Sequence, residues 1–302
     1  MIVAEHLTKR YKKKVAVDNL SFTVETGRVT GFLGPNGAGK STTMRLMLGL
    51  DGGGGATTFD GKKLHEYSQP AHMVGVLLEA KAFHPTRKAR DHLRVLADAG
   101  GIPQSRVDEV LNEVGLTEVA KSRPGKFSLG MSQRLGIAAA ILGKPKYLML
   151  DEPANGLDPE GIAWLREFLK SYADKGNAVF VSSHGLSEMA QMADNVVVIG
   201  KGKLIADTSI TELLAENGHS SIFVRSPKLS VLERTLKARK ATVTQAGDGL
   251  RVSGLTTDEL GKLAFENNVP VYELAQQKAS LEQVFLELTA TSQEFATKKE
   301  NV

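Results

Sequence analysis

The chain has 302 residues, of which 41% are hydrophobic and 24% are charged. This composition is ordinary for a folded globular protein, and the length leaves room for two domains. The absence of cysteine excludes disulfides and thiolate zinc sites and fits a reducing cytosol. The formal net charge of +4 is too small to indicate nucleic-acid binding by itself. The first residues lack the pattern of a secretory signal, and every apolar run is too short for a bilayer span, so we expect neither.

Strands are expected first along the chain, and helices after them. Apolar runs bounded by turns predict strands at residues 2–4, 15–17, 20–24, 29–33, 56–59 and 74–78. From about residue 85 to residue 142, apolar residues recur every three or four positions instead, which predicts helices. One of these helices is expected to open at Ser105, with Asp108 as its capping partner.

Buried parallel strands are predicted next, at residues 147–150, 178–181 and 196–199. Between the first two of them, Asp158 followed by Pro159 marks the start of an amphipathic helix. Because strands alternate with helices here, we expect an α/β fold whose parallel sheet is covered on both faces.

The pattern changes after about residue 215. Strands at residues 222–225, 241–245, 250–253 and 271–274 and helices at residues 230–238 and 258–267 follow the order β-α-β-β-α-β, with a further helix at residues 281–289. That order is typical of a split, ferredoxin-like unit. We therefore expect a first domain over residues 1–215, a small α+β domain over residues 216–292 and a solvated tail over residues 293–302. The second domain could serve stability or regulation.

The segment at residues 34–42 fits the phosphate-binding pattern G-x-x-x-x-G-K-[ST]. It follows a predicted strand and opens a helix, as this loop requires. Its glycines let backbone N–H groups converge on phosphate oxygens, Lys40 adds a positive charge, and Ser41 offers a hydroxyl to Mg²⁺. The alternative is a glycine-rich turn that binds nothing. The predicted nucleotide-binding residues are Gly34, Pro35, Asn36, Gly37, Ala38, Gly39, Lys40, Ser41 and Thr42.

Two carboxylates follow the predicted strand at residues 147–150. In a nucleotide site one carboxylate can hold Mg²⁺, usually through water, while the other orients the attacking water or takes its proton. We assign Asp151 to the metal and Glu152 to the water, the alternative being a pair of acidic loop residues. Upstream, Ser128 and Gly130 open a helix, where they could bind an anion or simply cap the helix.

These motifs together resemble the ATPase subunit of ATP-binding cassette (ABC) transporters. The phosphate loop, the signature at Ser128 and Gly130, the pair of carboxylates, the loop ending at Asp158, and His184 occur in the order of that family. The resemblance covers about residues 1–215. It implies a P-loop NTPase core with an N-terminal antiparallel β subdomain and a helical subdomain, to which the small ferredoxin-like domain is added.

The resemblance also implies site roles. Each ATP would lie between the phosphate loop of one subunit and the signature of the other in a head-to-tail homodimer, so that Ser128, Gly130 and Asp158 become nucleotide-binding residues. Tyr11 would stack on adenine, although its basic surroundings at residues 9–14 could also be a nucleic-acid or lipid patch or a solvated turn. His184 would contact the γ-phosphate as a catalytic residue beside Glu152, whereas a lone histidine after a strand is otherwise more often structural.

The chain departs from the family pattern at three positions. Glu79 stands where glutamine is usual, and its carboxylate can still ligate Mg²⁺ or its water while adding negative charge beside the triphosphate. Leu129 and Met131 replace the usual glycine and glutamine of the signature, and Leu129 removes some backbone freedom. Similar variants look like those of the drug- and peptide-exporting branch, which favours export.

We therefore expect an ATPase that uses ATP and Mg²⁺ and drives a separate membrane-spanning permease from the cytoplasmic face of the membrane. The resemblance implies that helices of the membrane protein dock on the segment at residues 79–97. One alternative is a soluble ABC-type ATPase acting on ribosomes or nucleic acid; a single phosphate loop and a small net charge argue against it, so no nucleic-acid partner is expected. Another is a regulatory module that binds ATP without turnover, which the presence of Glu152 and His184 disfavours.

Overall fold

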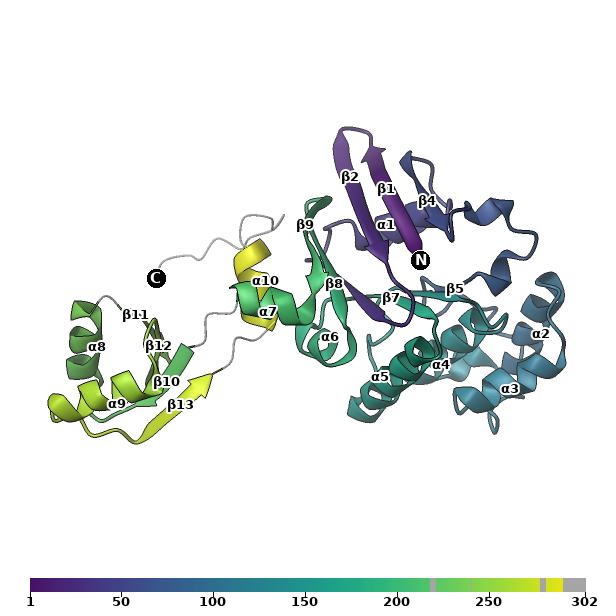
Figure 1. The fold of residues 1–302 in the computed structure, drawn as a ribbon. Coiled ribbons are helices and arrows are strands. Elements are labelled where there is room, and N and C mark those ends of the chain that lie inside the picture. Colours follow the sequence, from purple (N-terminus) through teal and green to yellow (C-terminus); the bar gives the residue numbers. More distant parts are fainter. Residues whose placement is uncertain (218–220, 240, 278–280, 290–302) are drawn as a thin grey trace. The chain divides into compact units, whose positions relative to one another are not determined.

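The computed structural model describes residues 1–217, 221–239, 241–277 and 281–289 (Figure 1). The chain forms two compact units: Met1–Ile210 together with the described residues Leu288 and Thr289 form the first, and Thr211–Glu287 form the second. The boundary predicted at residues 215 and 216 therefore lies within one helix, α7 (Ile210–Asn217). The tail predicted at residues 293–302 lies outside the described residues.

The first unit is built on a six-stranded sheet in the order β5-β6-β7-β3-β8-β9. These strands are β3 (Val29–Leu33), β5 (Val74–Leu77), β6 (Tyr147–Leu150), β7 (Ala178–Ser183), β8 (Asn195–Gly200) and β9 (Lys203–Ser209). All neighbours pair in parallel except β9, which pairs antiparallel with β8. Every residue of β3, β6 and β7 is buried, as their mainly apolar sequences predict, and the buried residues include Thr30, Ser182 and Ser183.

A smaller antiparallel sheet, in the order β2-β1-β4, packs on this core (Figure 1). Its strands are β1 (Ile2–Tyr11), β2 (Lys14–Val24) and β4 (Gly54–Phe59). The stacked rings of Phe22, Phe32 and Phe180 join the two sheets, with centroids 4.9 to 5.7 Å apart. The predicted strands were too short here because β-bulges interrupt the alternation, for example near His6 (φ 53°) and Asn19 (φ 52°).

The helices of this unit form two groups. Helices α1 (Lys40–Met47), α5 (Pro159–Asp174) and α6 (Leu186–Met192) follow strands of the central sheet, whereas α2 (Ala89–Ala99), α3 (Ser105–Glu113) and α4 (Leu129–Ala140) pack on one another. The second group is the predicted helical subdomain. The expected cap of α3 is wrong: the helix begins at Ser105 itself without a side-chain cap, and Asp108 instead pairs with Arg90 at 2.7 Å.

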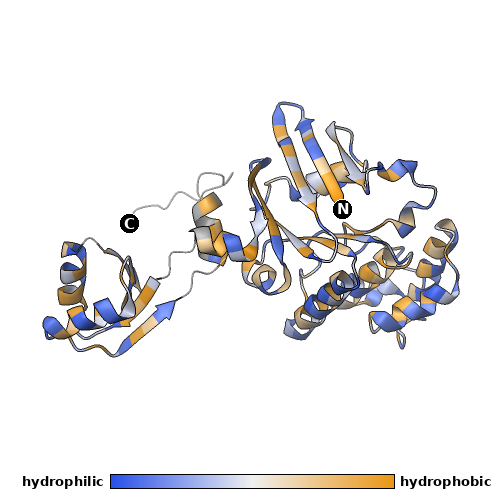
Figure 2. Cartoon of the chain, in the orientation of Figure 1, coloured by the Kyte–Doolittle hydropathy of each residue, from blue (hydrophilic) through white to orange (hydrophobic). Residues whose placement is uncertain are grey.

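The second unit has the predicted ferredoxin-like order. After α7, its elements are β10 (Ser221–Arg225), α8 (Leu229–Ala238), β11 (Thr242–Ala246), β12 (Gly249–Ser253), α9 (Thr257–Glu266), β13 (Glu273–Gln277) and α10 (Leu281–Thr289). The last two residues of α10 belong to the first unit. The sheet order is β11-β12-β10-β13, with antiparallel neighbours throughout. Apolar residues on one side of α8 and α9 pack with the sheet into a core of their own, and Figure 2 shows both helices with hydrophilic and hydrophobic stretches.

Within the described ranges, no helix combines the length and the apolar character that a bilayer span requires. Three strands of the central sheet, β3, β6 and β7, end at the same edge and are followed by the phosphate loop, the pair of carboxylates and His184. Because the carboxyl ends of parallel strands meet at one edge, these three segments are brought together there.

Candidate functional site

A cavity of about 530 Å³ lies over the phosphate loop. It is lined by Tyr11, Lys14, Ala16, Pro35, Asn36, Gly37, Ala38, Gly39, Lys40, Ser41, Thr42, Glu152, Asn155 and His184. The structure therefore brings Tyr11, nearly all of the predicted loop, Glu152 and His184 into one place. The cavity also includes Lys14 and Asn155, which lie in the basic run and the motif loop noted in the sequence but were not assigned to the site. Ala16 was missed, because its residue type carries no distinctive signal.

The backbone of the loop is shaped for an anion. Gly37 (φ 80°) and Gly39 (φ 106°) adopt left-handed conformations, and a Cβ at Gly39 would lie 2.5 Å from the carbonyl oxygen of Ala16. No side chain caps α1, which begins at Lys40. The first N–H groups of that helix are therefore available to phosphate oxygens.

Lys40, Glu152 and His184 form one connected group. The Lys40 side chain is only 7% exposed; its Nζ donates to the carbonyl oxygen of Gly34 at 2.7 Å and lies 3.5 Å from Glu152 Oε1. The other carboxylate oxygen, Oε2, lies 2.8 Å from His184 Nδ1 and accepts the backbone N–H of His184 at 3.3 Å. Glu152 thus lies between Lys40, the lysine predicted to bind phosphate, and His184, where a carboxylate can orient water.

A buried serine that sequence reasoning missed holds the two carboxylates in place. Ser182 Oγ accepts the backbone N–H of Glu152 at 2.9 Å and donates to Asp151 Oδ1 at 2.5 Å. Glu152 has φ +49°, which is unusual for a residue with a Cβ, so the serine fixes a strained backbone. The one signal of Ser182 in the sequence is its position as a hydroxyl residue at the end of a buried apolar strand. Asp151 itself does not line the cavity.

Tyr11 ends β1 at the side of the cavity with its side chain 48% exposed. Its hydroxyl donates to Asp51 Oδ2 at 3.0 Å, and this hydrogen bond is the main reason that the pKa of Tyr11 lies above its ordinary value. Lys9 Nζ lies 4.9 Å from the centre of the ring. The ring is therefore anchored at its edge, and part of its surface is open to a ligand.

Ser128, Gly130 and Asp158 line a second cavity, of about 360 Å³, whereas Gly34 lines neither cavity. The second cavity also includes Leu129, Met131, Arg134, Gly156 and Leu157. Ser128 Oγ accepts the N–H of Met131 at 3.2 Å and Asp158 Oδ1 accepts the N–H of Gly161 at 2.8 Å, so that both side chains cap helices, α4 and α5. The second cavity contains Ser128, Gly130 and Asp158, and it shares no residue with the cavity of the phosphate loop. One chain therefore holds the two predicted halves of a nucleotide site in separate places.

Glu79 is exposed and lines neither of these cavities, but an apolar groove beside β5. Among the described residues, no three His, Asp or Glu side chains gather to hold a metal ion. The hydroxyl of Ser41 and the carboxylate of Asp151 are nevertheless the hard oxygen donors that Mg²⁺ accepts when phosphates and water complete its shell.

A parallel sheet with a phosphate loop after β3 and an acidic pair after β6 defines a P-loop nucleotide-binding ATPase. The chain belongs more narrowly to the ABC transporter ATP-binding family, as comparison with known proteins shows. Residues 17–155 match the ABC transporter family model, and residues 220–282 match a domain of unknown function (DUF8746). The predicted family is thus confirmed.

Relatives match beyond the ATPase domain. The chain is 38% identical over 296 residues to the bacitracin transport ATP-binding protein BcrA of Bacillus licheniformis, covering 95% of this chain and 97% of that protein. It is 38% identical over 209 residues to the lantibiotic transport ATP-binding protein SrtF of Streptococcus pyogenes, covering 68% of this chain and 90% of that protein. A solved ATP-binding subunit of an ABC transporter is similar with a TM-score of 0.65 and 27% identity, covering 72% of this chain and 92% of that one.

The chain is therefore an ATP-binding, ATP-hydrolysing subunit of an ABC transporter. This conclusion agrees with the position of the predicted catalytic residues, Glu152 and His184, in the phosphate-loop cavity. A role on ribosomes or nucleic acid is not favoured.

Proposed function

We propose that two copies of this chain clamp two MgATP between them, head to tail, and drive a separate permease that exports a drug or a peptide. The single observation that supports the clamp is the division of the predicted ligands between two cavities of one protomer. Lys40, Glu152 and His184 line the first, whereas Ser128, Gly130 and Asp158 line the second. A second copy, turned around, would supply the half that each site lacks.

In this proposal each residue near the phosphate has one task. The loop N–H groups and Lys40 hold the phosphates, and Tyr11 stacks on the base. A phosphate would replace Glu152 as the partner of Lys40, leaving the Glu152 carboxylate and His184 to orient a water molecule. After hydrolysis, ADP and phosphate no longer hold the two copies together, and the copies separate.

Mg²⁺ belongs to the same proposal. It would be held by Ser41 and Asp151 together with the phosphates, with Glu79 as a further oxygen donor. The ion would supply positive charge to the triphosphate. The bond from Ser182 to Asp151 keeps one carboxylate oxygen oriented, which leaves the other oxygen for the ion or for its water.

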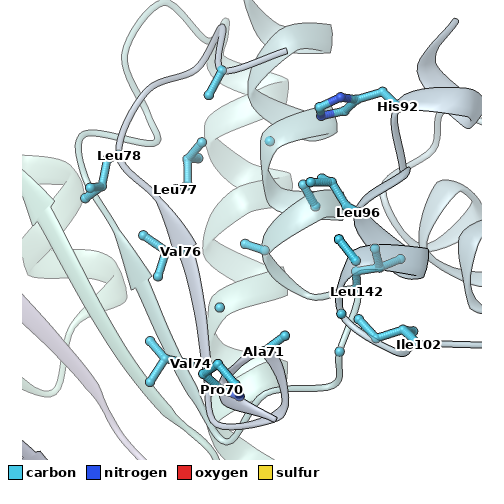
Figure 3. Close-up of a pocket in the computed structure, with 18 of the residues that line it drawn as sticks. Pro70, Ala71, Val74, Val76, Leu77, Leu78, His92, Leu96, Ile102 and Leu142 are labelled. Atoms are coloured by element: carbon cyan, nitrogen blue, oxygen red, sulfur yellow. The ribbon is translucent and has the colours of Figure 1, made fainter. Parts of the chain in front are cut away.

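An apolar groove of about 500 Å³ supports contact with a permease (Figure 3). It lies between β5, α2 and α4, and its walls include Val76, Leu77, Leu96 and Leu142, with His92 and Glu79 among its few polar side chains. This groove includes part of the segment predicted to dock membrane helices. A short amphipathic helix would fit such a surface, and we propose that the permease supplies one and thereby holds the chain against the cytoplasmic face of the membrane.

The class of cargo is inferred from relatives whose names refer to bacitracin, to lantibiotics and, at 31% identity over 306 residues, to linearmycin resistance. We propose that the transporter served by this chain exports a peptide or drug of this kind. Cells that express the chain together with its permease should then tolerate more peptide antibiotic than cells with the permease alone. Equal sensitivity in both would refute the export proposal.

Glu152→Gln tests the clamp and the catalytic assignment together. The variant keeps the size and the hydrogen-bonding shape of the side chain but cannot accept a proton, so it should bind MgATP, form stable dimers and lose at least about 100-fold in turnover. Sizing by light scattering and a phosphate-release assay measure the two effects. Turnover at the parent rate would contradict the role of Glu152, and a monomer at saturating MgATP would contradict the clamp.

The soluble alternative is tested with the parent chain. Stimulation of its ATPase activity by ribosomes or DNA, and none by membranes, would favour that alternative.

A further inference from the structure

The signature turn packs on the loop that follows Glu152 in the same chain. Leu129, the first residue of α4, is 41% exposed and lies directly over Gly156. A methyl group added to Gly156 would lie 1.9 Å from Leu129 Cδ2 and 2.9 Å from its Cγ. Gly156 has φ +72°, so glycine serves here both for its backbone conformation and for the space it leaves.

The contact is reciprocal. Leu157, the next residue along the loop, lies over the other small residue of the signature: a methyl group added to Gly130 would lie 3.3 Å from Leu157 Cδ2. Each segment therefore presents a leucine to a glycine of the other. Such interlocking fixes the distance between two segments, because neither leucine can move inward or be replaced by a bulkier group without displacing its neighbour.

A buried amide joins the same two segments one turn further along α4. Gln133 is 3% exposed, and its Nε2 donates to the carbonyl oxygens of Glu152 and Asn155, each at 3.4 Å. The loop from residue 152 to residue 158 therefore begins in the phosphate-loop cavity and ends in the signature cavity, with α4 attached along it.

We infer that Leu129 is a positioning residue: its packing contact with Gly156 fixes the position of the signature turn relative to the loop that carries Glu152. The inference rests on the proposed function, in which Ser128 and Gly130 bind the nucleotide held by a second copy. When the signature closes on that nucleotide, the Leu129–Gly156 contact and the Gln133 amide transmit the movement to Glu152 in the chain's own site. Leu129 replaces the usual glycine of the signature, and Gly156 leaves the space that its larger side chain occupies.

Gly156→Ala tests this contact, because the added methyl group would displace the Leu129 side chain. Turnover should fall about 10- to 100-fold, since a displacement of about 1 Å can cost that much in rate. Binding of a fluorescent ATP analogue to the single chain should stay unchanged, because no residue of the phosphate-loop cavity is altered. In the Glu152→Gln background, the same change should weaken MgATP-driven dimerisation.

The double variant Leu129→Ala/Gly156→Ala separates the clash from backbone strain. Removing the leucine side chain relieves the clash but not the left-handed conformation of residue 156, so turnover should return to that of Leu129→Ala alone. Gly176→Ala is the matched control for strain: Gly176 has φ +86° with open space around it, and its substitution should leave turnover unchanged. Turnover of the double variant clearly below that of Leu129→Ala alone would overturn the inference.

Leu129→Ala alone keeps the inference testable if Gly156→Ala does not fold. It should lower turnover while nucleotide affinity stays the same, whereas Leu204→Ala, at a leucine 40% exposed in β9, should change neither. Parent turnover in Leu129→Ala would refute the positioning role. Failure of Glu152→Gln alone to dimerise with MgATP would instead refute the proposed function.

Discussion

Glu152 faces different partners with its two carboxylate oxygens, Lys40 on one side and His184 on the other. Its backbone is in a left-handed conformation, which costs of order 1–3 kcal/mol for a residue with a Cβ. The hydrogen bond from its N–H to Ser182 helps to hold that conformation. At the scale of the residue, therefore, the conformation of the proposed catalytic residue depends on a serine that does not line the phosphate-loop cavity.

Ser182→Ala should lower turnover about 10- to 100-fold with little change in ATP affinity, because it frees both Asp151 and the backbone of Glu152. Steady-state kinetics separate kcat from KM. The matched control is Ser183→Ala, whose equally buried hydroxyl accepts the N–H of Gly185 instead. Equal losses in both variants would mean that the effect is general destabilisation.

At the scale of elements, a polar cluster joins β4 to β6. The Asp60 carboxylate, just after β4, accepts hydrogen bonds from Lys146 Nζ at 2.6 Å and Tyr147 Oη at 2.5 Å, and from the amino group of Met1 at 2.8 Å. Burial by itself would raise the pKa of Asp60, but these bonds outweigh burial and hold the pKa well below its usual range. The ionised form therefore stabilises the native state.

Asp60→Asn should consequently lower the free energy of unfolding at pH 7. The native pKa is depressed, so the contribution of Asp60 is fully present above the unfolded pKa of about 4 and is lost as the pH falls below it. Urea unfolding from pH 7 to pH 3 should show the difference from the parent shrinking with acidity. Asp18→Asn, which removes an exposed ion pair with Lys203, should have little effect at any pH.

The elements themselves could be predicted where the signal is local and uninterrupted. The strand at residues 29–33, the strand at residues 147–150 and the helix that Asp158 caps all appear as expected. The errors fall where tertiary contacts override a local pattern. β1 and β2 are longer than their regular stretches because bulges are tolerated within a paired ladder, and Asp108 pairs with Arg90 across helices instead of capping its own.

At the scale of the whole molecule, the candidate nucleotide site lies in the first unit, and each unit has its own hydrophobic core. A chain that ends at Asn217 keeps every residue that lines the phosphate-loop cavity, so it should bind ATP with an affinity within about threefold of the full chain. Titration with a fluorescent ATP analogue measures this. Loss of binding in a folded truncated chain, judged by circular dichroism, would show that the second unit supports the site.

The sequence by itself determined the class of the protein, because a phosphate loop and an acidic pair are contiguous segments whose chemistry depends on local backbone. It also indicated the order of elements in the second unit, where each strand and helix has its own periodicity. The tertiary structure alone decided which of the motif residues share a cavity, and that Ser182, Gln133 and Gly156 support them. These contacts join segments that are far apart in the chain, and no local pattern records a contact that only packing creates.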